Sequence, residues 1–544
     1  MRTTRAVVAS ALAAGLLLLQ AACRREPAAL GQAVPPSGPQ QGGFVIVAIP
    51  ADLATLNEYH WGTGASELQV IDMLFPTLMQ EQPDYHLHPP SFAPRLASSW
   101  EFSQDNRTLT FSLRRDAFWS DGVPVTAEDV RFTFQVQKDP RIGSPGLEIK
   151  DFISHVEVVD PFTVRFHFTR VYPYQLMDAN DGHIVPAHAW GKIPFEQWAE
   201  TDFMTRMVTC GPFRFASFSP QQTLILDRDP TYWGQPRPYL NRVIFRVIPE
   251  ASSQVNQLLG GQVHVVPMVP PRLAERVKSS RDVDLVEVPS RTWGFIAWNN
   301  RHPLFRDRRV RRAMTYAINR KNAVDTAYHG FARLAVGPIL SSMWAFNRNL
   351  PQFPYDPEQA RALLREAGWL PSPADGTLMR NGTPFTFDLL YPATNPIRQD
   401  LALMIQSDLA KIGVRVRPQP IEYTTMVARL ESGDFAASMS AWEEATKVDL
   451  TGTWATPGPG QGSNNFVAYS NPEVDRLIAA ARLEPDHTRA KVILDRIQEL
   501  IVEDQPVTFL YESTLLVGVS RAIKGADINA SSVFFNIEEW YWGS

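Results

Sequence analysis

Cysteine is scarce in this chain, which has only Cys23 and Cys210 among its 544 residues. Two cysteines cannot supply a disulfide framework, and neither belongs to a CxxC pair. The HExxH spacing of zinc proteases is also missing, so nothing predicts a structural or catalytic metal, or any other cofactor. We expect Cys210 to be a small buried side chain, because no partner histidine or second cysteine marks it as a nucleophile.

An excess of charge of one sign is lacking too. The chain has 52 basic and 57 acidic residues, and its aromatic residues do not interleave with basic ones as they do in RNA-binding proteins. The short basic run at residues 309–312 is typical of a solvated helix face. We therefore predict that nucleic acid is not a partner.

The motifs of common hydrolases are missing as well. There is no GxSxG and no convincing nucleophile beside a base, so we predict that the chain is not an enzyme. A pair of catalytic carboxylates stays open, because 57 acidic residues are available. An exported hydrolase is therefore the competing class of function.

A long apolar run occurs at the N-terminus, where residues 6–19 follow two arginines. This is the layout of a bacterial export signal, and the run is too short to remain as a membrane span. The small residues before Cys23 resemble a lipoprotein cleavage box, which predicts a signal peptide over residues 1–22 and acylation of Cys23. Gln20 departs from the box, because an aliphatic residue is usual there, so ordinary cleavage near Ala22 stays open.

Either cleavage places the protein outside the cytoplasm. Residues 23–43 are rich in Pro, Gly and Gln, which predicts a flexible tether that lifts a folded body off a membrane surface. With Cys23 acylated, the protein would lie in the periplasm or cell envelope, anchored to a membrane by lipid.

Length and patterning predict an α/β protein with two or three domains. A chain of 544 residues is too long for a single core. Helix and strand patterns alternate: a helix pattern at residues 255–259 leads into a strand pattern at 263–266, and a capped helix is predicted at 356–367. Such alternation predicts mostly parallel or mixed sheets covered by helices.

The stretch from residue 96 to 134 has the most distinctive order of motifs. Alternating polar and apolar side chains at 108–114 predict a half-buried strand, and Thr126 followed by acids predicts a helix N-cap. In this order the motifs resemble the family 5 extracellular solute-binding proteins, which are the oligopeptide, dipeptide and nickel receptors of ABC importers. The segments that carry the resemblance are LASSWE (96–101), FSLR (111–114) and WSDGVPVTAEDV (119–130).

The resemblance covers the chain from about residue 44 to the C-terminus and implies its fold. Members of the family have two α/β lobes of the periplasmic-binding-protein, or Venus-flytrap, type and an inserted extra domain. The implied boundaries are lobe I at 44–58, 171–290 and 507–544, the extra domain at 59–170 and lobe II at 291–506. Two segments would then cross between the lobes, near 293–300 and near 506–511.

The resemblance also implies a function. Such a receptor captures peptides or similar small solutes between its lobes and delivers them, as a monomer, to the permease subunits of an ABC importer. Ligand between the lobes stabilises the closed form through its contacts with both, which could signal occupancy to the transporter. A receptor for a non-peptide solute, either an oligosaccharide or a metal chelate, is the alternative.

The segments that face the ligand in the family predict the residues of the cleft. Aromatic walls with a few polar groups suit a ligand whose side chains vary. The candidates are Tyr59, His60, Trp61, Trp293, Phe295, Asn299, Tyr423, Trp442 and Asn464.

One charged contact of the peptide receptors is altered in this chain. Those receptors commonly place an aspartate three residues after the tryptophan that corresponds to Trp442, because a buried ligand ammonium needs a carboxylate. Here that position is Ala445. Either a neighbouring glutamate supplies the charge, or the ligand has no free α-amino group. Glu444 is the candidate, since Glu443 fits a solvated loop residue better.

Overall fold

The computed structural model describes residues 38–60, 64–142, 150–458 and 463–543. Residues 41–544 form one compact unit, and residues 1–40 are assigned to another. The predicted signal peptide, Cys23 and Trp61 lie outside the described residues. Among the described helices, none has the length and apolar character needed to span a membrane.

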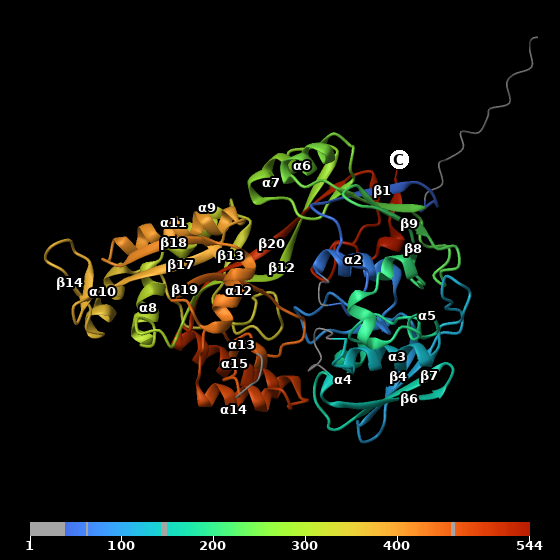
Figure 1. Cartoon of the computed structure of the whole chain (residues 1–544), viewed down its shortest axis with the longest axis horizontal. Coiled ribbons are helices and arrows are strands. Elements are labelled where there is room, and N and C mark those ends of the chain that lie inside the picture. The colour runs from blue at the N-terminus through green and yellow to red at the C-terminus, as the bar shows by residue number, and fades with distance from the viewer. Residues whose placement is uncertain (1–37, 61–63, 143–149, 459–462, 544) are drawn as a thin grey trace, which may run out of the picture. The chain divides into compact units, whose positions relative to one another are not determined.

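A mixed sheet runs through the unit 41–544, and in the part of the chain that the structure describes it has eleven strands. They are β1 (Phe44–Ile49), β8 (Phe213–Ser219), β9 (Thr223–Arg228), β10 (Arg242–Val247), β11 (Val265–Val266), β12 (Val283–Trp298), β13 (Ala332–Leu334), β17 (Thr386–Pro392), β18 (Arg415–Ile421), β19 (Ala437–Glu443) and β20 (Val507–Ser520). Their order is β18-β17-β19-β12-β20-β11-β1-β10-β9-β8, and β13 pairs with β20. We call the part at the β8 end the first lobe and the part at the β18 end the second lobe (Figure 1).

The strands β12 and β20 are antiparallel neighbours that belong to both lobes. The early part of β12 and the late part of β20 pair beside β11, whereas the late part of β12 lies between β19 and β20. The predicted crossing segments overlap these two strands. The register of the pair shifts between Pro289 and Trp293 and again between Gly294 and Phe295. We call the pair of strands the connecting ribbon.

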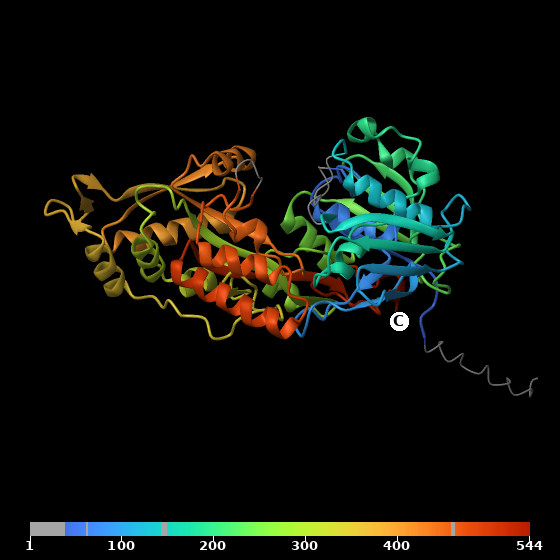
Figure 2. The ribbon, with the colours of Figure 1, turned by 90° about the horizontal axis from the view of Figure 1, so that it is seen from below.

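The first lobe packs together with a smaller antiparallel sheet of order β4-β5-β7-β6 (Figures 1 and 2). One hydrophobic core joins the two, because Val45 and Val243 of the first lobe belong to the same buried cluster as Leu109 and Phe166 of the small sheet. The elements are β4 (Ala97–Phe102), β5 (Thr108–Leu113), β6 (Ile153–Asp160), β7 (Thr163–Phe168), α2 (Ala65–Leu74), α3 (Ala127–Lys138), α6 (Ala251–Leu259) and α7 (Pro271–Lys278).

The second lobe has β17, β18 and β19 with helices around them. Three of these helices have proline at their first position and begin after a capping Asp or Asn side chain, for example Asp356, which accepts a hydrogen bond from the backbone N–H of Gln359. The helices are α8 (Arg308–Ala317), α9 (Arg320–Ala327), α10 (Pro357–Glu366), α11 (Pro396–Ala410), α12 (Tyr423–Ser432), α14 (Pro472–Ala481) and α15 (His487–Asp504).

Shorter elements make up the connections. The strands are β2 (Met79–Glu81), β3 (Phe92–Pro94), β14 (Leu370–Pro371), β15 (Leu378–Arg380), β16 (Thr383–Pro384), β21 (Ile523–Lys524) and β22 (Tyr541–Trp542). The helices are α4 (Gln175–Asn180), α5 (Ala187–Trp190) and α13 (Thr451–Trp454), with short 3-10 helices at Phe195–Glu200, Phe203–Arg206 and Ile537–Glu539.

Most of the predicted local structure is confirmed. The strand at 108–114 is β5, Thr126 caps α3, and Cys210 is an unpaired side chain that is 2% exposed. The helix predicted at 255–259 begins earlier, at Ala251, because the side chain of Glu250 accepts a hydrogen bond from the next turn. Glutamate is not among the residues that favour N-cap positions, so the pattern concealed this start.

Candidate functional site

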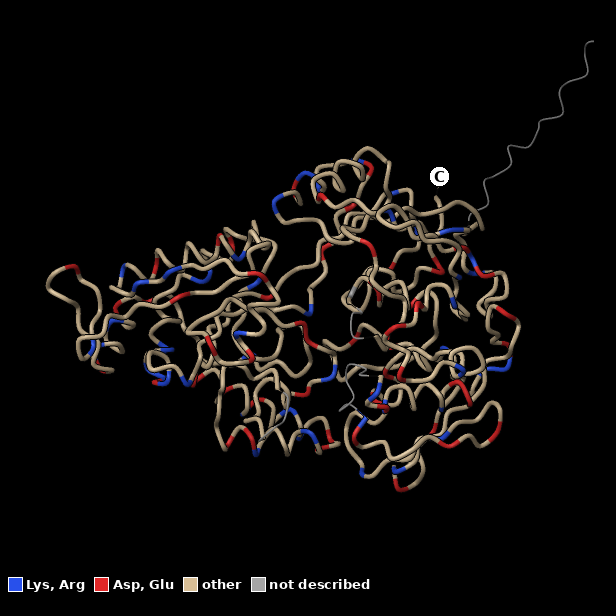
Figure 3. Tube along the Cα trace, viewed as in Figure 1, with Lys and Arg blue, Asp and Glu red and all other residues tan. Residues whose placement is uncertain are grey.

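A polar cavity of about 670 Å³ lies where the first lobe, the small sheet and the loop after β19 meet. Its lining carries five acidic and five basic residues, and both signs are interspersed along the whole described trace (Figure 3). The charged lining residues are Asp72, Glu81, Asp178, Asp181, Glu538, Arg95, Arg114, Arg237, Arg291 and Lys447. We call this space the central cavity.

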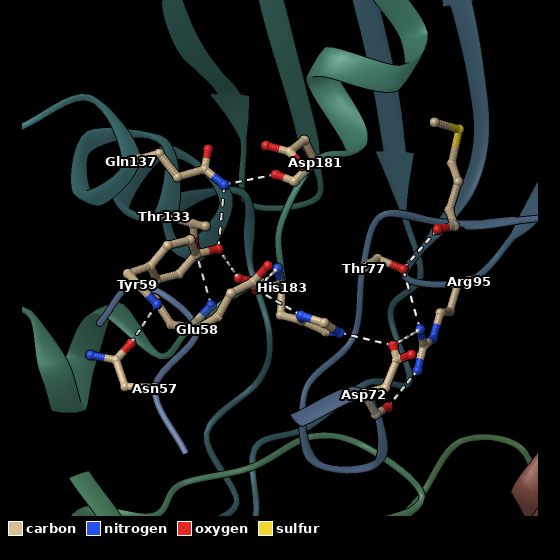
Figure 4. Close-up of polar contacts among 12 residues, drawn as sticks. Asn57, Glu58, Tyr59, Asp72, Thr77, Arg95, Thr133, Gln137, Asp181 and His183 are labelled. Atoms are coloured by element: carbon tan, nitrogen blue, oxygen red, sulfur yellow. Dashed lines mark hydrogen bonds and ion pairs between the residues drawn. The ribbon is translucent and has the colours of Figure 1, made fainter. Parts of the chain in front are cut away.

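One wall of the central cavity is held by an arginine that follows β3. Arg95 donates to the Asp72 carboxylate (3.3 Å), to the Asp72 carbonyl (2.8 Å) and to the Thr77 hydroxyl (3.3 Å). The hydroxyl of Thr77 in turn donates to the carbonyl of Met79 (2.7 Å). The end of α2 is thereby bound to the start of β2 (Figure 4).

His183 lies behind this wall and is shared by two carboxylates. Its Nδ1 is 2.7 Å from Glu58 Oε2 and its Nε2 is 2.8 Å from Asp72 Oδ1 (Figure 4). Burial alone would lower the pKa of His183, but the two carboxylates outweigh it and raise the pKa to about 10. The ring is therefore an imidazolium that donates from both nitrogens at neutral pH. No group in the described residues has the make-up of a metal site.

The loop after β1 is fixed through the same network. The backbone N–H of His183 also donates to Glu58 Oε2 (2.7 Å), and the Tyr59 hydroxyl donates to the carbonyl of His183 (2.6 Å). Gln137 of α3 donates to the Tyr59 hydroxyl (3.3 Å) and to the carbonyl of Asp181 (2.7 Å). The loop that was predicted to face ligand is thus tied to the cavity wall.

A second wall contains an ion pair between the two lobes. The side chain of Asp178 is 2% exposed and lies 2.8 Å from Lys447 Nζ of the second lobe. Tyr172 donates its hydroxyl to the same carboxylate (2.8 Å). Burial raises the pKa of Asp178, and the nearby charge of Lys447 acts in the opposite direction. Next to this pair, the Tyr174 hydroxyl donates to the carbonyl of Val448 (2.9 Å).

The loop after β19 brings Ala445 and Thr446 to the cavity, opposite Glu81 at the end of β2. Burial raises the pKa of Glu81, while a hydrogen bond with the Thr446 side chain and the charge of Arg291 lower it. Ala445 itself is exposed and has no carboxylate. The acid that faces this part of the cavity therefore comes from β2, which pairs with β3, and not from the loop after β19.

An aromatic cluster lies on the second-lobe side of the same loop. Trp293 and Phe295 of β12 are each 2% exposed, with ring centroids 4.6 Å apart. Phe295 also stacks at 6.4 Å on Trp442 of β19, which contacts Phe466 at 5.6 Å. Trp442 and Phe466 are half-buried. They are the members of this group of four that a ligand can reach.

Glu444 is held against this cluster. Its Oε1 accepts a hydrogen bond from the indole Nε1 of Trp293 (2.7 Å), and its backbone N–H donates to the carbonyl of Arg291 (2.9 Å). Burial raises the pKa of Glu444, and the indole hydrogen bond lowers it. No cationic side chain of the described residues lies within ion-pair distance of this carboxylate.

Comparison with known proteins identifies the family of this chain. The model for bacterial extracellular solute-binding proteins, family 5 (middle region), matches residues 91–464, which is more than half of the chain. The chain belongs to this family. The predicted family is thereby confirmed. The chain is a solute-binding protein with two α/β lobes, and the members of its family act outside the cytoplasm.

Two relatives of this family 5 chain cover most of its length. It is 27% identical over 512 residues to the oligopeptide-binding protein AppA of Bacillus subtilis, covering 92% of each chain. The solved structure of AppA in complex with a nonapeptide matches with a TM-score of 0.80 at 26% identity, covering 93% of this chain and 100% of the other. Heme-binding protein A of Haemophilus influenzae is 26% identical over 456 residues, which are 79% of this chain and 81% of that protein.

The predicted contact residues of this family 5 protein occupy different environments. Tyr59 is buried, and His60 is half-buried with its backbone N–H bonded to the carbonyl of Asn57 (3.1 Å). Asn299 is buried and donates to the carbonyls of Gly433 and Phe435, which follow α12. Tyr423 at the start of α12 is 62% exposed, and Asn464 is exposed. Their roles as ligand contacts stay predictions.

The central cavity is lined by residues that sequence reasoning missed. None of the described candidates is among its lining residues, which instead include Glu81, Arg291 and Lys447. Their charges come from segments that lie hundreds of residues apart in the sequence, so no local pattern could identify them. Only Lys447 lies close to a position that the sequence had marked, because it follows Ala445 by two residues.

Proposed function

We propose that this protein is the receptor of an ABC importer and that it binds a peptide or a similar small solute between its lobes. The observation that carries the proposal is the central cavity, which both lobes line with five acidic and five basic residues. A cavity of about 670 Å³ is within the range that holds small ligands. Peptides carry both signs of charge, and the cavity offers counter-charges for each.

The contact between the lobes supports this role. Lys447 and Asp178 join the two sides of the cavity at 2.8 Å, so a solute enclosed there touches groups whose positions depend on how the lobes meet. A ligand shifts such an equilibrium only by its differential contacts with the two arrangements. The transporter then reads the closed arrangement as occupancy.

The predicted contact residues form the second part of the proposal. Trp442 and Phe466 provide an accessible aromatic surface for variable side chains of the solute. Tyr59, His60 and Trp61 belong to the segment after β1 that was predicted to face the ligand. Trp293 and Phe295 are buried, and Phe295 packs against Trp442 of the aromatic surface. The predicted set is completed by Asn299, Tyr423, Glu444 and Asn464.

A non-peptide solute is the second candidate. It is favoured by Ala445, which lines the cavity without the carboxylate that would hold a ligand ammonium. The relative named heme-binding protein A belongs to the same set of similar proteins. Delivery is proposed to occur in the periplasm or cell envelope, with acylated Cys23 as the membrane anchor and the protein as a monomer.

Calorimetric titration with pools of peptides of two to ten residues tests the proposal. We expect saturable binding without any product, since the site is built for capture. Mass spectrometry of solute released from the freshly purified protein identifies the natural ligand. Saturable binding of a chelate or sugar, with no response to any peptide pool, would refute a peptide receptor, and turnover of the peptides would favour the exported hydrolase.

A further inference from the structure

A hairpin extends from the core of the first lobe into the second lobe. It comprises residues 79–94, in which β2 and β3 pair antiparallel, and we call it the arm. The backbone N–H of Met79 donates to Asn180 Oδ1 (2.6 Å), and the side chain of Gln80 donates to the carbonyl of Phe535 (3.2 Å). Met79 also belongs to the buried cluster that the first lobe shares with the small sheet. The base of the arm is therefore fixed outside the second lobe.

The tip of the arm is packed into the second lobe through Tyr85. Its side chain is 4% exposed and belongs to the buried cluster of the second lobe, in which every other buried member that the structure describes lies between Trp293 and Phe509. The backbone N–H of Trp344 also donates to the carbonyl of Tyr85 (2.9 Å). A tyrosine buried to this extent removes a large apolar area from water, so it favours the arrangement in which the arm and the second lobe are in contact.

Between these two attachments the arm has hydrogen bonds of its own. The Asp84 carboxylate accepts from the backbone N–H of Ser91 (3.1 Å) and from its hydroxyl, and the backbone N–H of Gln82 donates to the carbonyl of Ser91 (2.9 Å). The backbone N–H of Leu87 donates to the carbonyl of Asp84 (2.9 Å), which closes a turn around Tyr85. All of these bonds lie within the arm, so the turn that presents Tyr85 does not depend on the second lobe.

We propose that Tyr85 is a latch between the lobes, which leaves the second lobe when the lobes separate and returns to its site when they close. Because the base of the arm stays with the first lobe, any separation of the lobes withdraws the tip from the second lobe. Burial of Tyr85 then favours the closed arrangement before a solute arrives, and a solute needs less differential affinity to complete closure. The inference goes beyond the proposed function, because it concerns the protein without a solute.

Distances between two spin labels test the latch in protein that dialysis in urea and refolding have freed of solute. The labels are attached at Val159→Cys of β6 and Val492→Cys of α15, which are 44% and 68% exposed in the native chain. The background carries Cys23→Ala, and Cys210 is buried.

Separation of the lobes should lengthen the distance between the labels. The two sides meet near them, since the guanidinium of Arg482 lies over the ring of Phe152 at 4.9 Å. With Tyr85 present we expect mainly one short distance. Tyr85→Ala should raise the ratio of long to short distances at least about 10-fold, because it removes a buried side chain whose burial favours the closed form.

Variants of the same arm separate the latch from a general loss of structure. Leu87→Ala removes an apolar side chain that is 69% exposed, and Tyr85→Phe keeps the buried ring, so both should give the distances of the unmodified arm. Circular dichroism shows whether each variant folds. If Tyr85→Ala does not fold, Tyr85→Leu carries the test, with an expected rise in the ratio of at least about 3-fold.

Two results would overturn the latch. One is a distribution that Tyr85→Ala, or Tyr85→Leu in its place, leaves unchanged, because the arm would then move with the second lobe. The other is a distribution dominated by long distances while Tyr85 is present. Both results leave the proposed function standing, since calorimetry measures the binding of peptides separately.

Discussion

Replacing His183 with glutamine should remove a buried cation on which two carboxylates depend. The His183 side chain is 9% exposed and lies 2.7 Å from Glu58 and 2.8 Å from Asp72. Glutamine is neutral and cannot donate in two opposite directions, so both acids lose their shared partner, although Arg95 still contacts Asp72. Removing one member of a buried charge network typically costs 3–5 kcal/mol, so we expect the free energy of unfolding to fall by about 4 kcal/mol at pH 6.5.

The loss should become smaller as the pH rises. The pKa of His183 is raised from 6.5 to about 10 in the folded protein. A raised pKa contributes stability that is complete below the unfolded value and is lost as the pH rises toward the folded value. Each pH unit inside this window corresponds to about 1.4 kcal/mol. The unfolded histidine is half protonated at pH 6.5, so the slope is smaller there, and between pH 6.5 and 8.5 the difference between wild type and variant should shrink by about 2.3 kcal/mol.

Urea unfolding followed by circular dichroism at half-unit steps of pH measures this difference. His88→Gln is the matched control, because that side chain is 52% exposed and its contact with Asp84 is 3.8 Å long. It should change the free energy of unfolding little at any pH. A difference between wild type and His183→Gln that stays constant from pH 6.5 to 8.5 would show that His183 does not carry the charge, and the network would then need another explanation.

Three further predictions concern other parts of the chain. Gly211→Ala should destabilise the protein by about 1–3 kcal/mol in urea unfolding, because its Cβ would lie 2.2 Å from the carbonyl oxygen of Met73. Lys447→Met should lower the free energy of unfolding by about 3 kcal/mol, since it leaves the carboxylate of Asp178 buried without its nearest cation. Cys23→Ala should move the protein from the membrane fraction to the soluble fraction and abolish incorporation of labelled fatty acid.

Matched variants give each of these predictions a reference. Gly452→Ala adds a Cβ that meets nothing within 4 Å, so it should cost less than Gly211→Ala. Lys321→Met removes an exposed ion pair with Asp325 and should cost under about 1 kcal/mol. Persistence of the Cys23→Ala variant in the membrane fraction would contradict the lipid anchor.

Much of the fold could be predicted because local signals agree with it. The alternation at 108–114 and the capping box at Thr126 are determined by neighbouring residues, and the structure has β5 and α3 there. The order of these motifs also identified the family. The strand and the helix cap depend on interactions within a few residues, so they can be predicted from a single sequence.

The environment of the cleft residues depends on contacts that no local pattern records. Residues 293–298 are all buried because β12 lies between β19 and β20 with both faces covered. A strand in that position reads as a continuous apolar run, so Trp293 and Phe295 pack into the core. The cavity charges of Glu81 and Arg291 meet only through the folded arrangement. Sequence patterning could not bring them together.

The connecting ribbon has a mechanical consequence. Two strands bonded side by side resist sliding past each other, because sliding breaks every hydrogen bond between them, whereas a change in twist breaks few. The register shifts between Pro289 and Phe295 interrupt the ladder, so fewer hydrogen bonds between the strands oppose a change in twist there. Arg291 stands inside that stretch. The stretch of the ribbon that can change its twist is therefore the stretch that brings Arg291 to the central cavity, so a rotation of one lobe against the other would also change the shape of the cavity wall.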